Sequence, residues 1–154
     1  MDREVRMIVD KVIKRETDSM LDATERVMSE MGDSRPSKTQ IRNLLDVAYY
    51  REAASLREIC EYIDYLWGKE KMDRKNKNNR NKNISSANKI KVSLEEEVKE
   101  IMNAIKEEAG EMDSAVEKEK QGIELLIAEK YFGYLYWKFT VNEAEKGKSN
   151  GGWT

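Results

Sequence analysis

Three short sequences, each a serine followed three residues later by glutamine or glutamate, divide this chain into helices. They are Ser37-Lys38-Thr39-Gln40, Ser55-Leu56-Arg57-Glu58 and Ser93-Leu94-Glu95-Glu96. In such a capping box the serine hydroxyl accepts a hydrogen bond from a free N–H of the first turn, and the later side chain reaches back to the serine N–H. Apolar residues spaced three and four apart follow each box, which is typical of one buried helix face. The three boxes therefore predict three helix starts.

The same apolar spacing covers most of the remaining chain. Pro36 is the only proline, and it ends a predicted turn that begins at Asp33. We predict helices over about residues 2–31, 37–54, 55–68, 93–109 and 115–144. The predicted fold is all-α, a compact bundle of about five helices with one long basic loop. It forms a single helical domain over residues 1–146, followed by a disordered tail over residues 147–154.

The basic loop is predicted over residues 71–92, where the apolar spacing stops. Residues 72–83 read MDRKNKNNRNKN and contain almost only Asn, Lys and Arg. Because such a stretch cannot build a core, it cannot offset the entropy of ordering, and we expect it to be flexible. Its cations are candidates for sequence-independent contact with nucleic-acid phosphates: Lys75, Lys77, Arg80 and Lys82. The alternative is a solubilising linker.

A second group of cations lies at the predicted start of the second helix. It consists of Arg35, Lys38 and Arg42. A helix N-terminus attracts anions through its free N–H groups, and neighbouring cations strengthen that attraction. These residues predict a phosphate-binding site, and ordinary surface charge is the alternative.

The composition excludes several kinds of chemistry. The chain has no histidine, which removes Ser-His and Cys-His catalysis and zinc sites that use histidine. Cys60 is the only cysteine, so no intramolecular disulfide is expected, and we interpret it as a small buried apolar residue. No stretch approaches the roughly 20 apolar residues that span a bilayer, and the N-terminus does not resemble a signal peptide. We expect a cytoplasmic protein that is not an enzyme, with no cofactor and no contact with a membrane.

Two further motifs have a functional and a structural interpretation. Glu107, Glu108 and Glu111 match the EExxE element with which all-α nucleoside-triphosphate pyrophosphatases hold Mg²⁺, but the ExxD element is missing because no Asp follows Asp113. Aromatic residues of the last helix could stack on bases, although core packing is the favoured interpretation: Tyr131, Tyr134, Tyr136 and Trp137.

Three segments resemble the small subunit of type III CRISPR effector complexes, in particular the Csm-complex small subunit. Lys38-Thr39-Gln40-Ile41-Arg42 is similar to the opening of a helix in that family. Tyr65-Leu66-Trp67-Gly68-Lys69 is similar to the end of a second helix, with Lys in place of Arg, and residues 129–138 are similar to the aromatic last helix. A related Cmr-type or type I small subunit is an alternative.

The resemblance implies a non-catalytic subunit that stacks as a short filament beside other CRISPR effector subunits. Such a subunit binds guide RNA and target RNA through the backbone, without sequence specificity, because base pairing with the guide reads the sequence. It implies RNA contact by Lys38, Arg42 and Lys69, to which electrostatics adds Arg35 and the loop cations. The alternative is a helical protein–protein adaptor, in which the exposed half of the last helix is the interface and the basic loop only a spacer.

Overall fold

The computed structural model describes the backbone of residues 1–32, 36–50, 53–73 and 77–150, and the side chains of these ranges except 67–73, 77–85 and 142–150. Within these ranges the regular elements are all helices, which confirms the all-α prediction. They are α1 (Arg3–Arg15), α2 (Thr17–Met31), α3 (Lys38–Tyr49), α4 (Leu56–Asp73), α5 (Lys77–Ala109), the 3₁₀ helix η2 (Gly110–Met112), α6 (Asp113–Lys118) and α7 (Lys120–Asn150).

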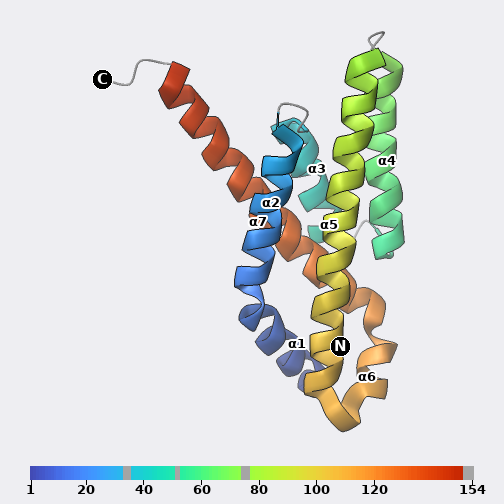
Figure 1. The fold of residues 1–154 in the computed structure, drawn as a ribbon. Coiled ribbons are helices and arrows are strands. Elements are labelled where there is room, and N and C mark those ends of the chain that lie inside the picture. The colour runs from blue at the N-terminus through green and yellow to red at the C-terminus, as the bar shows by residue number, and fades with distance from the viewer. Residues whose placement is uncertain (33–35, 51–52, 74–76, 151–154) are drawn as a thin grey trace.

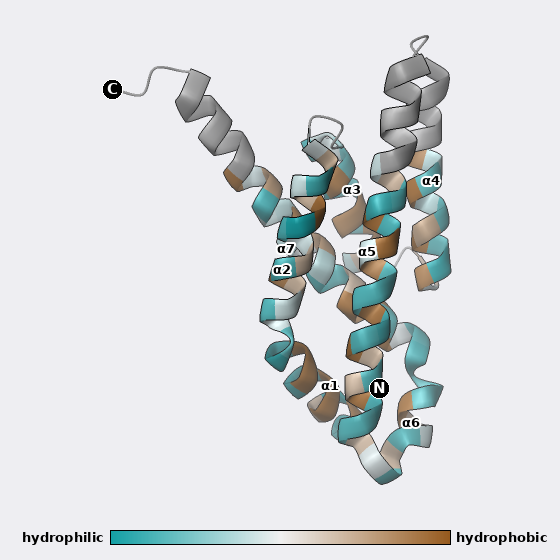
Figure 2. Ribbon diagram, viewed as in Figure 1, coloured by the Kyte–Doolittle hydropathy of each residue, from teal (hydrophilic) through white to brown (hydrophobic). Residues whose placement is uncertain are grey.

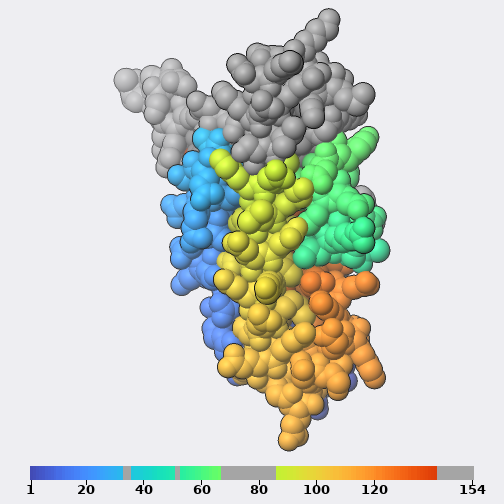
Figure 3. Space-filling model, turned by 45° about the vertical axis from the view of Figure 1, so that its right-hand side comes forward, coloured from blue at the N-terminus to red at the C-terminus, as the bar shows by residue number. Residues whose placement is uncertain are grey.

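The helices form a bundle around α7 (Figure 1). Helices α4 and α5 lie side by side, and α5 runs along one face of the molecule between α2 and α4 (Figures 1 and 3). Helix α7 crosses obliquely behind α2 and packs against α2, α3, α4 and α5. Hydrophilic and hydrophobic residues alternate along the helices (Figure 2), and buried hydrophobic residues from the helices form one core cluster.

Local hydrogen bonds explain where several helices begin. The Asp2 carboxylate accepts from the N–H groups of Glu4 and Val5, at 2.8 and 3.3 Å, and caps α1. The predicted capping box of α3 is confirmed, because Ser37 and Gln40 exchange hydrogen bonds at 2.9 and 3.2 Å. Sequence chemistry therefore determines the start of α3, the helix that carries two predicted site residues.

The predicted helix over residues 2–31 is two helices, separated at Glu16. The Thr17 hydroxyl donates to the carbonyl of Ile13 at 3.3 Å, a contact that bends helices. Glu16 itself has a φ of −92° and a ψ of 10°, outside the helical range. The apolar spacing could not show this change of direction, because both helices bury residues of the same stripe.

The loop predicted over residues 71–92 is wrong in its second half. Helix α5 begins at Lys77, and Ala87 and Ile90 are buried before the predicted helix start. Ser93 consequently lies inside α5 and is not a cap. The reason is that Ala87, Ile90 and the buried Leu94 follow one another at spacings of three and four residues, so they extend the stripe that packs against α2 and α4.

The last predicted helix also differs at both ends. It is divided at Glu119 into α6 and α7, and α7 continues to Asn150 into the predicted tail. The centre of α7 is completely buried at Ile127, Tyr131, Phe132 and Leu135. Helix α7 is therefore the central packing element of the bundle. Among the described residues, no helix combines the length and apolar character that crossing a bilayer requires.

Candidate nucleic-acid interface

The structure describes the side chains of two predicted RNA-binding residues, Lys38 and Arg42. Arg35 and Lys75 lie outside the described residues. The other four lie on the helical backbones of α4 and α5, where side chains are not described: Lys69, Lys77, Arg80 and Lys82. The geometry of the predicted site can therefore be built only from α3.

Lys38 and Arg42 converge on the ring of Tyr136, which α7 presents to α3. The Lys38 Nζ lies 5.7 Å and the Arg42 Cζ 5.6 Å from the centre of this ring. Both distances are within the range of cation–π attraction. Arg42 also pairs with Asp46 at 3.3 Å. The pKa of Arg42 is raised, first by a hydrogen bond with Tyr136 and then by the charge of Asp46, so the guanidinium remains fully charged. We call Lys38, Arg42 and Tyr136 the α3 cluster.

A second set of side chains lies on the exposed side of α7. At about 100° per residue, four positions fall within about 60° of one another around the helix: Lys130, Tyr134, Trp137 and Val141. We call these four residues the outer face of α7. Trp137 is 62% exposed and Val141 is 53% exposed. Tyr136 lies about 100° further around, so the α3 cluster borders this face.

A shallow groove of about 310 Å³ continues the outer face toward α1. Lys130 and Tyr134 line it from α7, and Arg6, Asp10 and Lys14 line it from α1. Arg6 pairs with Asp10 at 3.0 Å, so three cations and one carboxylate stand around the groove. Cations therefore border the outer face of α7 on both sides, toward α3 and toward α1.

The aromatic residues of α7 divide between core and surface. Tyr131 is fully buried, which confirms the packing interpretation there, and Tyr134 and Tyr136 are half-buried. Trp137 contradicts that interpretation. At about 100° per residue, Trp137 lies about 160° around the helix from the buried Phe139 and Leu135. The sequence alone therefore contained an indication that Trp137 is exposed.

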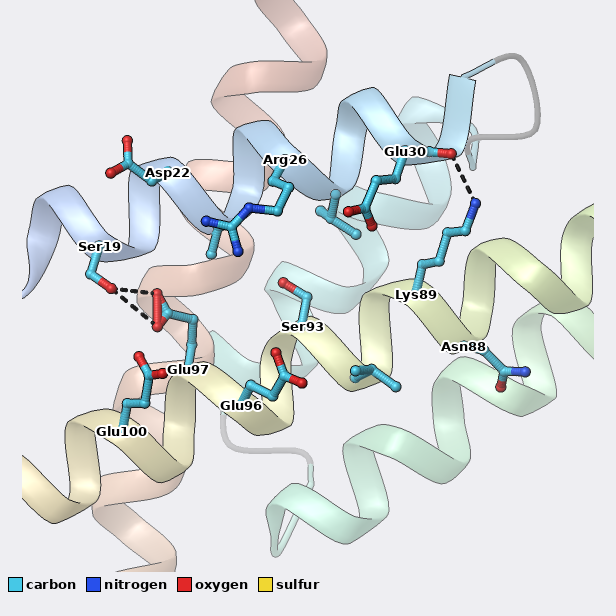
Figure 4. A pocket seen from close by; sticks show the side chains of 13 residues that line it. Ser19, Asp22, Arg26, Glu30, Asn88, Lys89, Ser93, Glu96, Glu97 and Glu100 are labelled. Carbon is cyan, nitrogen blue, oxygen red and sulfur yellow. Dashed lines mark hydrogen bonds between the residues drawn. The ribbon is translucent and has the colours of Figure 1, made fainter.

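A groove between α2 and α5 is acidic (Figure 4). It has a volume of about 960 Å³, and its carboxylates come from Asp22, Glu30, Glu96, Glu97 and Glu100. Arg26 and Lys89 are the cations among the lining side chains. Because carboxylates predominate, this groove repels phosphate and is a poor candidate for nucleic acid.

Glu97 is the buried carboxyl of the acidic groove. Its residue is only 5% exposed, and the Ser19 hydroxyl donates to the carboxylate at 2.9 Å (Figure 4). Burial raises the pKa of Glu97, which the hydrogen bond from Ser19 opposes and the nearby carboxylate of Glu100 reinforces. This carboxyl therefore belongs to the contact between α2 and α5.

The structure gives no support to the magnesium-binding interpretation of Glu107, Glu108 and Glu111. Glu108 pairs with Lys11 and Arg15 of α1, which lower its pKa and connect α1 to α5. In the part of the chain that the structure describes, no three or more acidic, histidine or cysteine side chains are grouped so that they could hold a metal ion.

Cys60 is half-buried, so the interpretation of this residue as a small buried apolar side chain is borne out only in part. Its Sγ–H donates to Glu95 Oε1 at 3.4 Å. Burial, followed by the hydrogen bond to Glu95, raises the pKa of the thiol to about 12. Little thiolate is present at neutral pH, and this residue is a poor nucleophile.

Comparison with models of protein families, with curated proteins and with solved structures gives no match for this chain. The candidate interface is therefore defined by geometry alone: the α3 cluster, the outer face of α7 and the groove toward α1.

Proposed function

We propose that this protein is a non-catalytic, cytoplasmic subunit that binds the backbone of RNA without sequence specificity. The convergence of Lys38 and Arg42 on the ring of Tyr136 supports this proposal most directly. An aromatic ring that holds two cations near one place reduces the side-chain entropy cost of binding a phosphate. Both cations stand at the start of α3, where the helix dipole also favours an anion.

The proposal extends to the kind of assembly that the sequence motifs suggest. In a type III CRISPR effector complex, such a subunit would contact guide RNA and target RNA and would stack on copies of itself and on other effector subunits. The support is the segment Lys38 to Arg42, which resembles the family motif and begins with the capped first turn of α3. In this proposal the guide supplies sequence recognition and the α3 cluster holds the backbone.

A second candidate function is that of a helical protein–protein adaptor. The observation that favours it is the exposure of Trp137 and Val141 on α7, since exposed aromatic residues are enriched in protein interfaces. The cations on both sides of this face favour nucleic acid over an apolar partner.

Charge reversal of the α3 cluster tests the proposed function. We expect Lys38→Glu with Arg42→Glu to weaken binding of a labelled single-stranded RNA, measured by fluorescence anisotropy at several salt concentrations. Removing one cation from a phosphate should reduce the slope of log affinity against log salt by roughly 0.7. The slope should therefore fall by roughly 1.4 for both residues.

The matched control reverses two exposed cations elsewhere, Arg57→Glu on α4 and Lys99→Glu on α5. It changes the net charge equally but lies away from the α3 cluster. If the control and the α3 variant show equal decreases in affinity and salt slope, the α3 cluster is not the site. If the wild-type protein captures another protein and binds no RNA, the adaptor function takes its place.

A further inference from the structure

We propose that Trp137 is a stacking platform for an unpaired base, so that the outer face of α7 binds single-stranded nucleic acid more tightly than a duplex. This inference rests on the proposed function and adds the class of strand that is bound. It uses residues other than the α3 cluster, so the two can be tested separately.

The orientation of Trp137 supports a platform. Tyr134 contacts it edge to face, with ring centres 5.3 Å apart and ring planes at 66°. This contact braces the indole from one side, while 62% of the residue remains exposed. A large, braced and exposed aromatic ring on a regular helix is suited to stacking with a base, since every base offers an aromatic face.

The charges beside Trp137 are suited to the phosphates of the same strand. Lys130 lies seven residues earlier on the outer face, about 10 Å along the helix axis. It borders the groove toward α1, to which Lys14 and Arg6 contribute. On the other side of Trp137, the α3 cluster adds two more cations. An extended strand can therefore cross α7 between cations while one base rests on the indole.

Three acidic residues at the margins of this surface are paired with cations. Asp10 pairs with Arg6, Asp46 with Arg42, and Glu25 of α2 pairs with Lys138 at 3.6 Å. These pairs reduce the repulsion that a phosphate would otherwise meet. Duplex nucleic acid has its bases stacked inside, so it could use the cations but not the indole.

The experiment compares single-stranded oligouridylate with duplex RNA of the same length. We expect the single strand to quench the tryptophan fluorescence of the wild-type protein, and the quenched component to be absent from Trp137→Phe. Trp137→Ala should weaken single-strand binding roughly 5- to 150-fold, the range typical of removing one base-stacking residue. Its affinity for duplex RNA should be unchanged.

Val92→Ala is the matched control, because Val92 is an exposed apolar residue of α5 beside the acidic groove, outside the proposed interface. It should leave both affinities unchanged. If RNA binds through the α3 cluster but Trp137→Ala binds as tightly as wild type, without a fluorescence change, this inference is false and the proposed function remains. If the wild-type protein binds no RNA, both fail.

A partner other than RNA would also be visible in this experiment. If Trp137 fluorescence shifts with protein concentration in the absence of RNA, and sedimentation shows a dimer that Trp137→Ala abolishes, a second copy covers the outer face. That result would overturn the inference.

Discussion

At the residue scale, Tyr131 shows how a polar group is accommodated in the centre of the bundle. The residue is completely buried, and its hydroxyl donates to the Ser93 hydroxyl of α5 at 2.8 Å. Burial raises the pKa of Tyr131, so the phenol stays neutral. A buried donor without a partner is costly, so the Tyr131 hydroxyl depends on this hydrogen bond. The bond links α7 to α5.

We expect Ser93→Ala to lower the free energy of unfolding by about 1–3 kcal/mol, since it leaves the Tyr131 hydroxyl without its partner. Tyr131→Phe in the Ser93→Ala background should restore part of this stability, because it removes the unsatisfied group. Urea denaturation of both single variants and the double variant measures the coupling. Strictly additive effects would show that the bond contributes nothing beyond the two side chains.

At the element scale, α2 and α5 meet around the carboxyl of Glu97. Its raised pKa means that the folded state holds a proton more tightly than the unfolded state, whose carboxyl has its ordinary pKa of about 4.5. The contribution of Glu97 to folding stability therefore decreases as pH rises from about 4.5 through the pKa of Glu97 in the folded state. The buried charge of Glu97 weakens the α2–α5 contact at neutral pH.

We expect Glu97→Gln to raise the free energy of unfolding at pH 7, because the amide carries no charge and its oxygen can still accept from Ser19. The gain should disappear below about pH 4, where the wild-type carboxyl is also neutral. Denaturation at a series of pH values measures it, with the exposed neighbour Glu96→Gln as the control. A gain that is independent of pH would show that burial of charge is not the cause.

The helices also show which features the sequence could predict. The capping box at Ser37 is a local signal, and α3 begins where it predicts. The box at Ser93 is the same local signal, but no helix begins there. Tertiary packing prevails, because Ala87 and Ile90 continue the buried stripe before Ser93. The polar composition of residues 72–83 concealed that continuation.

The candidate site could also be predicted only in part, because neighbouring residues show some of its features and tertiary packing creates the others. Lys38 and Arg42 could be identified as cations near a helix start, which needs only neighbouring residues. Their shared contact with Tyr136 joins positions about a hundred residues apart, and only the packing of α3 on α7 creates it. Helical spacing alone could have predicted that Trp137 is exposed, but the apolar residues around it favoured a prediction of burial.

At the scale of the whole molecule, stability depends on the buried side of α7. Phe132 is completely buried, and α7 packs against four other helices. Its opposite side carries Trp137, which is exposed. One helix therefore separates the residues that hold the bundle together from those proposed to bind RNA.

We expect Phe132→Ala to lower the free energy of unfolding by about 3–5 kcal/mol, since it removes buried apolar surface and leaves a cavity. Trp137→Ala on the same helix should change it by less than about 1 kcal/mol. Thermal denaturation followed by circular dichroism compares the two variants. Similar decreases would mean that the exposed face also supports the fold, and the binding effect of Trp137→Ala would then need to be separated from stability.

The position of α7 in the chain has a consequence for synthesis. Helix α7 follows every helix against which it packs. At roughly 5–20 residues per second, a ribosome completes α2 and α3 on the order of ten seconds before the residues that cover them. During that interval their apolar faces are open to chaperones, and a chain that stops before Lys120 never closes its core. Among the described side chains, the last buried one of α7 is Phe139, so translation as far as Phe139 supplies the residues that complete the core.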